Sequence, residues 1–273
     1  MIGTNLAITT KNYAVAGGVT YDADALAYFT ANTAITSDAD KNAINTFYLG
    51  LKSDGIYTKM KAMYLPIWGS AASSKWNLVN PLDTNAAFRI SFATGMTFSS
   101  GGMTSNGTSG YADTWLNSST DLTLNNTHVS FYSRTNNTLQ QVEIGSGTAT
   151  TNLIQLACNF QSVGSFSDQY NVNSRITTPQ TDSRGLFLGT RTSSAIHKLF
   201  KNGSQIGTTN TSAGGTLVNL KLVLLGSNVN NIVSSYSTKQ CSFASIGDGL
   251  TDTEATNFYN RVQTLMTYFG INV

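Results

Sequence analysis

Carboxylates are the residues most able to do chemistry in this sequence, and few of them could act as a pair. The 273 residues include 14 Asp and Glu, and only Glu143 and Glu254 are glutamates. Retaining glycosidases need two carboxylates about 5 to 5.5 Å apart, which acids at alternate positions of one strand supply. Glu143 has no acid two or four residues away, and Glu254 completes a helix capping box that begins at Thr251. Hydrolysis is therefore disfavoured, although an Asp-based site stays open at Asp113, Asp121, Asp168 or Asp182.

The histidines and cysteines of the sequence do not form a recognisable catalytic motif. His128 and His197 are the two imidazoles, and a Ser-His-Asp site would need one of them. Serine is abundant everywhere, so composition selects no partner, and we expect both histidines to be exposed on strands. Cys158 and Cys241 lie in apolar, strand-like stretches and are expected to be buried thiols, with a bridge between them as the alternative. The spacing of Cys and His does not fit a zinc site.

Aromatic and amide side chains could form a binding site for a neutral glycan. Lectin sites combine an aromatic surface with amide and hydroxyl groups. Two aromatic residues flank the Gly-rich loop 106–110, and a third lies in the polar loop 227–238. We expect these loops to form a ligand site at one end of the fold, and the alternative is that the rings belong to the core, as we expect for Trp68 and Trp76. The candidate ligand-binding residues are Asn106, Tyr111, Asp113, Trp115 and Tyr236.

Calcium is the metal that the same region could bind. Asp113 and Asp121, with Asn117 and Asn125 nearby, carry the oxygen ligands that calcium prefers. The alternative is that these side chains bond their own backbone in turns. We favour the turns, and we expect no cofactor.

The charge of the chain excludes some partners. Only 11% of the residues are charged, and 16 Lys and Arg are scattered among 14 acids without a basic run. A nucleic-acid interface is therefore not expected. No apolar run is long enough to span a membrane, so membrane insertion is not expected either. A weakly charged chain with many Gly and Thr favours β structure with many turns.

Helical patterns come first along the chain. Asp22 and Ser37 are N-cap residues for two helices, because a short polar side chain there satisfies free backbone amides. The second helix carries an apolar stripe at helical spacing, and residues 56–65 read as a further short helix or a buried connection that Pro66 ends. The stripe consists of Ile44, Phe47, Tyr48 and Leu51.

Strand patterns follow from residue 85 onwards. Asn202-Gly203 between two extended runs favours a type I′ hairpin turn, because both positions need a positive φ. A strong helix then follows the capping box at Thr251, with Gly270 at its end, and its apolar stripe should pack on the outer face of the strands. Eight or more short strands predict a sandwich or jelly roll. The expected strands are 87–92 with 96–98 as its partner, 127–134, 140–144, 152–158, 184–190, 196–201, 217–225 and 241–246.

Two of these segments carry a resemblance to a known fold. The hairpin at residues 196–203 resembles the strand–Asn/Asp-Gly–strand unit of laminin-G-like, concanavalin A-type jelly rolls. Residues 241–254 resemble their closing segment, a strand followed by Leu-Thr-Asp-x-Glu and a helix. The resemblance implies a mainly β, concanavalin A-like (laminin-G-like) jelly-roll sandwich with an N-terminal helical region and a C-terminal helix.

A second resemblance concerns the setting of the protein. Residues 50–64, 77–83, 86–90, 106–113 and 130–134 are similar to pieces of uncharacterised bacteriophage structural and tail-type proteins that carry this jelly roll. The likeness runs from Tyr21 to the end of the chain and leaves residues 1–18 outside. It implies a virion location and supplies no catalytic residues.

These inferences together predict a virion surface protein of four parts. They are an arm that attaches to the particle (1–18), a helical region (19–66), the jelly roll (67–250) and a C-terminal helix (251–273). We expect a lectin-like, non-enzymatic tail, spike, fibre or capsid-projecting component that contacts other virion proteins and host-surface glycans, and a trimer would suit a fibre or spike. The alternatives are a minor capsid or decoration protein with a purely structural role, and a polysaccharide depolymerase.

Overall fold

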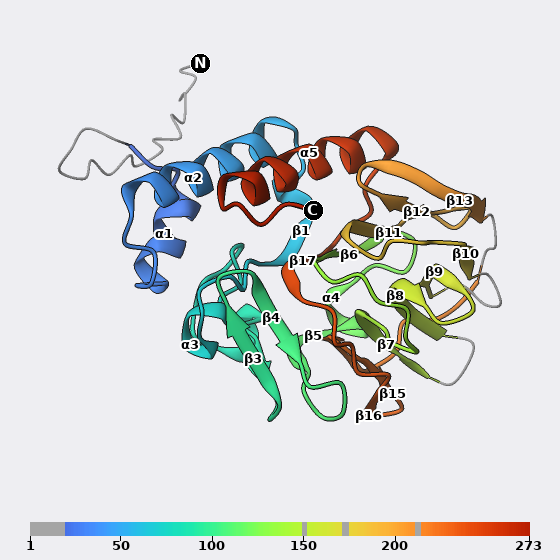
Figure 1. Ribbon diagram of the computed structural model, residues 1–273. Helices are drawn as coiled ribbons and strands as arrows, with labels where there is room; N and C mark the ends of the chain where they lie inside the picture. Colours follow the sequence, from blue (N-terminus) through green and yellow to red (C-terminus); the bar gives the residue numbers. More distant parts are fainter. Residues whose placement is uncertain (1–19, 149–151, 171–174, 211–213) are drawn as a thin grey trace, which may run out of the picture.

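The computed structural model describes residues 20–148, 152–170, 175–210 and 214–273. Its described strands form two sheets that pack face to face, with helices at one side (Figure 1). The mainly β sandwich expected from the sequence is therefore confirmed. The predicted N-terminal arm, residues 1–18, lies outside the described residues.

Eight of the described strands form the first sheet. Its pairs are antiparallel, and β17 lies beside β6 on one edge and beside β1 and β4 on the other. The Asn202-Gly203 turn joins β12 to β13 with φ angles of 49° and 75°, as the type I′ prediction requires. The strands, in sheet order, are β13 (Ser204–Asn210), β12 (Ile196–Lys201), β11 (Gly185–Ser193), β6 (Thr127–Ser133), β17 (Cys241–Gly247), β4 (Gly102–Ser105) and β3 (Met96–Ser99), with β1 (Met60–Tyr64) on β17.

The second sheet contains nine of the described strands. Its pairs are antiparallel except that β15 runs parallel to β7. Three strands from distant parts of the sequence, β7, β14 and β5, lie next to one another at its centre. The strands are β10 (Ile176–Thr178), β9 (Gly164–Gln169), β8 (Asn152–Phe160), β7 (Ile144–Thr148), β14 (Lys221–Leu224), β5 (Ala112–Asn117) and β2 (Ser91–Phe92), with the hairpin β15 (Ser227–Val229) and β16 (Ile232–Ser234) attached.

Both faces of the first sheet are buried. Along β11, Phe187 points into the core between the sheets, whereas Leu186 and Leu188 belong to a second core under the helices. This alternation follows from the two-residue period of a strand. Cys158 in β8 and Cys241 in β17 lie in the core between the sheets as free, buried thiols, so the expected burial is confirmed.

Helices α1 (Ala23–Ala31), α2 (Asp38–Ser53) and α5 (Asp252–Tyr268) cover the outer face of the first sheet (Figure 1). Asp22 and Ser37 cap α1 and α2, and the capping box at Thr251 is present. Phe258 and Val262 of α5 are fully buried, and each such side chain contributes about 1.5–3 kcal/mol. The predicted docking of the C-terminal helix is therefore confirmed. The remaining short helices are α3 (Ala71–Ser74), α4 (Ser118–Asp121) and two 3-10 turns, Tyr57–Lys59 and Asn85–Ala87.

None of the described helices combines the length and the apolar character that crossing a membrane requires.

Three sequence-based assignments were wrong in detail. The predicted helix or connection at 56–65 is largely strand β1, whose Met60–Tyr64 backbone pairs with β17 and brings part of the predicted helical region into the sheet. The predicted strand at 87–92 shrinks to β2, which pairs with β5 and not with β3. Residues 140–143 precede strand β7 and do not belong to it. For β1 and β2 the pairing partner, β17 or β5, decided the structure.

Candidate functional site

Strand β5 carries the centre of the candidate site. Its residues alternate between buried and half-buried, so that Asp113, Trp115 and Asn117 face away from the core between the sheets. The pairing with β14 shifts between Asp113 and Asn117, and Trp115 adopts a positive φ of 60° there. This irregularity bends β5 between Asp113 and Asn117, both of which pair with β14.

Trp115, Asp113 and Lys221 form one connected group. The Nζ of Lys221 lies 3.3 Å from the centre of the Trp115 ring and 3.3 Å from Asp113 Oδ2. The other Asp113 oxygen accepts the backbone amide of Trp115 at 2.8 Å, and Trp115 Nε1 donates to Ser91 Oγ at 2.8 Å. The indole is thus held at its nitrogen and covered on one face, and the charges of Lys221 and Asp113 offset each other.

Two tyrosines lie side by side at the neighbouring rim. The ring centroids of Tyr111 and Tyr236 are 6.4 Å apart at a tilt of 39°. The Tyr236 hydroxyl donates to the carbonyl of Val233 in β16 at 2.8 Å, which anchors that ring to the hairpin. Tyr111, which is half-buried, therefore packs beside an anchored ring.

The β15–β16 hairpin supplies the opposite wall. Asn230 and Asn231 form its turn with φ angles of 53° and 65°. Asn228 in β15 is 93% buried, because only 7% of its surface is exposed, and its Nδ2 donates to the carbonyl of Lys221 at 3.0 Å. Its Oδ1 is buried and accepts no hydrogen bond from any described residue. Such an acceptor is costly to leave unpaired.

These elements enclose a polar hollow of about 370 Å³, which we call the β5–β15 hollow. Four of its lining residues carry carboxamides, one is an aromatic, and one ion pair lies across it. A concave site with a few convergent polar groups is the usual form of a small-ligand site. The lining residues are Tyr111, Asp113, Asn117, Asn219, Leu220, Lys221, Val223, Asn228, Asn231 and Val233.

The structure brings four of the five candidate ligand residues together. Tyr111 and Asp113 line the hollow, Trp115 joins it through Lys221, and Tyr236 joins it through Tyr111. Asn106 is separate: its Oδ1 accepts the backbone amides of residues 108, 109 and 110, each at 3.0 Å. Its side chain shapes its own loop.

The residues considered as calcium ligands hydrogen-bond to backbone amides near them in sequence, as the turn alternative predicted. Asp113 Oδ1 accepts the amide of Trp115, and Asn117 Oδ1 accepts the amide of Ser119 at 3.1 Å while capping α4. Asp121 Oδ2 accepts the amide of Asn117 at 2.6 Å. The turn interpretation is therefore confirmed for Asp113, Asn117 and Asp121. Within the described ranges, no three His, Cys, Asp or Glu side chains come together as a metal site would require.

Both histidines are buried, which corrects the expectation of exposed strand positions. His128 has Nε2 2.9 Å from Ser245 Oγ and Nδ1 2.5 Å from the carbonyl of Asp248. Burial lowers the pKa of His128 to about 4, so the ring is neutral at neutral pH. His197 Nε2 lies 3.0 Å from Ser167 Oγ. These contacts link strands inside the fold, and the side chain of His128 has no exposed surface.

The other acids are engaged in structural contacts. Glu254 closes the capping box and pairs with Lys59 at 2.6 Å. Asp168 is buried against Arg175, with Oδ2 and Nη2 2.6 Å apart, and burial raises the pKa of this carboxyl. Asp182 forms an ion pair with Arg184, two residues away. None of the three lies beside a second carboxylate in the described contacts.

Sequence reasoning expected a strand at 217–225 and a site loop at 227–238, but it did not assign Lys221 or Asn228 to the site. One signal was present, because the Asn pair at 230–231 is a hairpin-turn pattern of the same kind as Asn202-Gly203. It would have predicted the hairpin. The neighbouring strand β14 lies within the expected strand 217–225, but its pairing with β5 and β7 is remote in sequence and could not be predicted.

Comparison with known proteins places the fold. No family model and no curated protein sequence matches the chain. Among solved structures, the chain is similar to domain 4 of an extracellular arabinanase from Geobacillus stearothermophilus in complex with arabinotriose. The TM-score is 0.52 at 12% identity, covering 74% of this chain and 98% of that domain. This likeness shows a shared β-sandwich fold.

Two further structures are more distantly similar. The CBM40 of the Ruminococcus gnavus IT-sialidase, bound to α2,3-sialyllactose, gives a TM-score of 0.37 at 18% identity over 48% of this chain and 80% of that one. The binding domain of botulinum neurotoxin serotype D gives 0.46 at 11% identity over 76% of this chain and 52% of that one.

Proposed function

We propose that this protein is a bacteriophage virion surface protein whose concanavalin A-like (laminin-G-like) sandwich binds host-surface glycans in the β5–β15 hollow. The observation that carries the binding part is Asn228, which lines that hollow and whose buried Oδ1 accepts no hydrogen bond from a described residue. A ligand hydroxyl would supply the missing donor. The gain would be larger than for an exposed acceptor, because the group has already lost its water.

The chemistry of the hollow fits a neutral sugar. The carboxamides of Asn219 and Asn231 can donate to and accept from hydroxyl groups, and Asn117 Nδ2, which donates to Asn219 Oδ1 at 2.6 Å, keeps one hydrogen for a ligand. Lys221 and Asp113 offset each other's charge, so the hollow does not select a charged ligand. The Tyr111 ring provides an apolar surface for the C–H face of a sugar. The fold neighbour that holds arabinotriose makes a neutral oligosaccharide the first ligand to test.

A binding role is favoured over a hydrolytic one. Glu254 is engaged in a helix cap and Glu143 in a buried ion pair with Lys239, so neither glutamate is free to act on a glycosidic bond. The virion setting rests on the resemblance of residues 50–64, 77–83 and 86–90 to phage structural proteins. Other virion proteins would then be the partners of residues 1–18, and a trimer would suit a fibre or spike.

A glycan array with the purified full chain and its Asn228→Ala variant tests the binding role. We expect wild-type binding to neutral oligosaccharides and about tenfold weaker binding by the variant. Absence of binding on the array and to host cells would refute this role. Immunogold labelling of phage particles with an antibody against the protein tests the setting, and unlabelled particles would refute it.

A further inference from the structure

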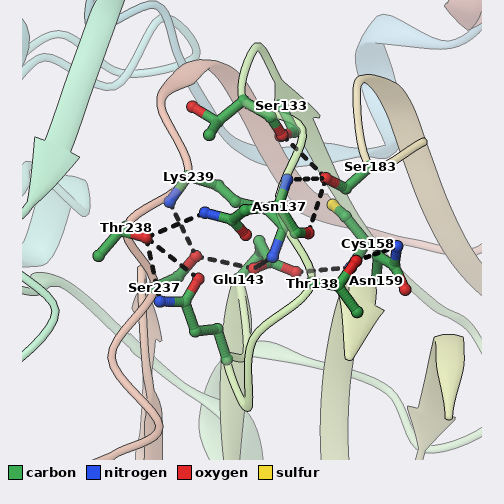
Figure 2. Close-up of polar contacts among 12 residues, drawn as sticks. Ser133, Asn137, Thr138, Glu143, Cys158, Asn159, Ser183, Ser237, Thr238 and Lys239 are labelled. Atoms are coloured by element: carbon green, nitrogen blue, oxygen red, sulfur yellow. Dashed lines mark hydrogen bonds and ion pairs between the residues drawn. The ribbon is translucent and has the colours of Figure 1, made fainter. Parts of the chain in front are cut away.

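A buried polar cluster lies between the segment that follows β6 and the segment that precedes β17 (Figure 2). At its centre, Lys239 Nζ is 3.2 Å from Glu143 Oε1, and neither side chain has any exposed surface. Removing two charges from water is costly unless each is also fully hydrogen-bonded. None of the side chains of the cluster lines the β5–β15 hollow.

The two charged partners differ in how well they are satisfied. Glu143 Oε2 accepts the backbone amide of Cys158 at 2.5 Å, and Oε1 accepts the Ser237 hydroxyl at 2.8 Å. Lys239 Nζ is an ammonium with three donors, yet it makes no hydrogen bond to a described residue. The ion pair between Lys239 and Glu143 is therefore not reinforced by hydrogen bonds from Nζ to other described residues.

Asn137 is the second unsatisfied member of the cluster. Its Nδ2 donates to Thr238 Oγ1 at 3.1 Å, so its carboxamide contacts the residue that directly precedes Lys239. Its Oδ1 is buried and accepts no hydrogen bond in the described structure. In Figure 2 the Asn137 side chain points toward Thr238 and Lys239.

Backbone pairing brings Asn137 and Lys239 into the same place. Strands β6 and β17 pair with Ser133 opposite Cys241, and the amide of Arg134 continues the pairing by donating to the carbonyl of Gln240 at 3.0 Å. Residues 134–137 therefore run antiparallel along residues 237–240. The buried amine of Lys239 and carboxylate of Glu143 thus lie beside the segment that carries Asn137, a half-buried residue whose Oδ1 is enclosed.

We propose that Lys239 and Asn137 form an intramolecular amide bond and that Glu143 moves the protons. Glu143 takes one proton from the ammonium, and the lone pair of Nζ attacks Asn137 Cγ. Glu143 then passes its proton to Nδ2 and takes a second proton from Nζ. The Cγ–Nδ2 bond breaks, ammonia leaves, and Nζ and Cγ remain joined as an amide.

The product removes the unfavourable features of the cluster. Nζ becomes a neutral amide nitrogen, and Glu143 becomes a neutral carboxylic acid, so no buried charge remains on either. Like a disulfide, the bond closes a loop of roughly 100 residues and restricts the unfolded chain. It joins the segment that follows β6 to the segment that precedes β17, and these two strands pair at the centre of the first sheet.

The intact mass of the full-length denatured protein tests the bond. We expect a mass lower than the sequence mass by one ammonia, and a protease digest in which the peptides of Asn137 and Lys239 are joined. Lys239→Met and Glu143→Gln should restore the sequence mass, whereas Lys198→Met, at a lysine on the surface, should retain the loss. The wild-type measurement stands even if a variant fails to fold.

Three outcomes would overturn the proposal. A wild-type mass equal to the sequence mass would leave the cluster as an ion pair. Loss of one water would instead join Lys239 to a carboxylate. Loss of ammonia that persists in Lys239→Met would place the reaction at an Asn-Gly pair, Asn106-Gly107 or Asn202-Gly203, where ring closure also releases ammonia.

Discussion

The ammonium group of Lys221 lies 3.3 Å above the centre of the Trp115 ring. The indole is therefore closed to a ligand on that face, while its nitrogen is held by Ser91. Tyr111, which lines the hollow, is left as the ring that a sugar can contact. Trp115 thus supports the site, and its contact with Lys221 has an energy that can be measured.

Lys221→Met should remove this cation–π contact while keeping the apolar part of the side chain. We expect the free energy of unfolding to fall by about 0.5–1 kcal/mol, the usual contribution of such a contact at a partly exposed site. Urea unfolding followed by tryptophan fluorescence measures the difference. Lys41→Met, at a surface ion pair on α2, serves as the control and should change stability by less. Equal effects of the two changes would contradict the prediction.

Asn228→Ala should weaken glycan binding about tenfold, which corresponds to about 1.4 kcal/mol and to the loss of one buried hydrogen bond. Titration calorimetry with the best array ligand gives the two dissociation constants. Asn42→Ala, an exposed amide on α2, is the matched control and should bind as the wild type does. If Asn228→Ala binds with unchanged affinity, its Oδ1 does not contact the ligand.

His128 should make stability depend on pH in a defined window. Its folded pKa of about 4 is lower than the ordinary value of 6.5, so the unfolded state binds the proton more readily. The contribution is fully present above about pH 6.5 and is lost as the pH falls toward 4, by roughly 3 kcal/mol in total. Urea unfolding at several pH values measures the slope. His128→Gln should flatten it, and an unchanged slope in that variant would assign the effect to other groups.

Thr251→Ala should destabilise the C-terminal helix, because Thr251 Oγ1 accepts the amide of Glu254 at the first turn of α5. Loss of such a cap costs about 1 kcal/mol. Thr251→Ser keeps the hydroxyl and should stay close to the wild type. Thermal unfolding of the three proteins ranks them, and equal midpoints would show that the cap contributes little.

Local chemistry made the helices and the hairpin predictable. Asp22, Ser37 and Thr251 are polar caps directly before apolar stripes, and the backbone amides they satisfy belong to the same helix. Asn202-Gly203 likewise specifies its turn without help from the rest of the chain. Each feature depends on residues within one or two turns of chain.

The polar strands were not predictable in the same way. All six residues of β9 are buried, although the strand reads Gly-Ser-Phe-Ser-Asp-Gln. Ser167 and Asp168 are tolerated there because His197 and Arg175 contact them from other parts of the chain. The same effect buried His128, whose partner Ser245 is 117 residues away. A polar sequence does not show that its hydrogen bonds will be made inside the protein.

The residues of the candidate site also differ in how far the local sequence could predict them. Asp113 and Trp115 lie on β5 with Tyr111 directly before it, and their place beside the loop 106–110 indicated a ligand site. Lys221 and Asn228 join them only through the sheet order β7–β14–β5, which the sequence does not reveal. The pairing partner of a strand is decided by the whole fold.

The two cysteines have a practical consequence. Both are free and fully enclosed, and burial raises the pKa of each thiol, so neither forms the thiolate that reacts with maleimides or iodoacetamide. A third cysteine placed at Ile232, the 69% exposed tip of the β15–β16 hairpin, would be the one reactive thiol of the folded protein. A dye or gold cluster attached there would mark the rim of the hollow at a single known position, with no need to remove the native cysteines first.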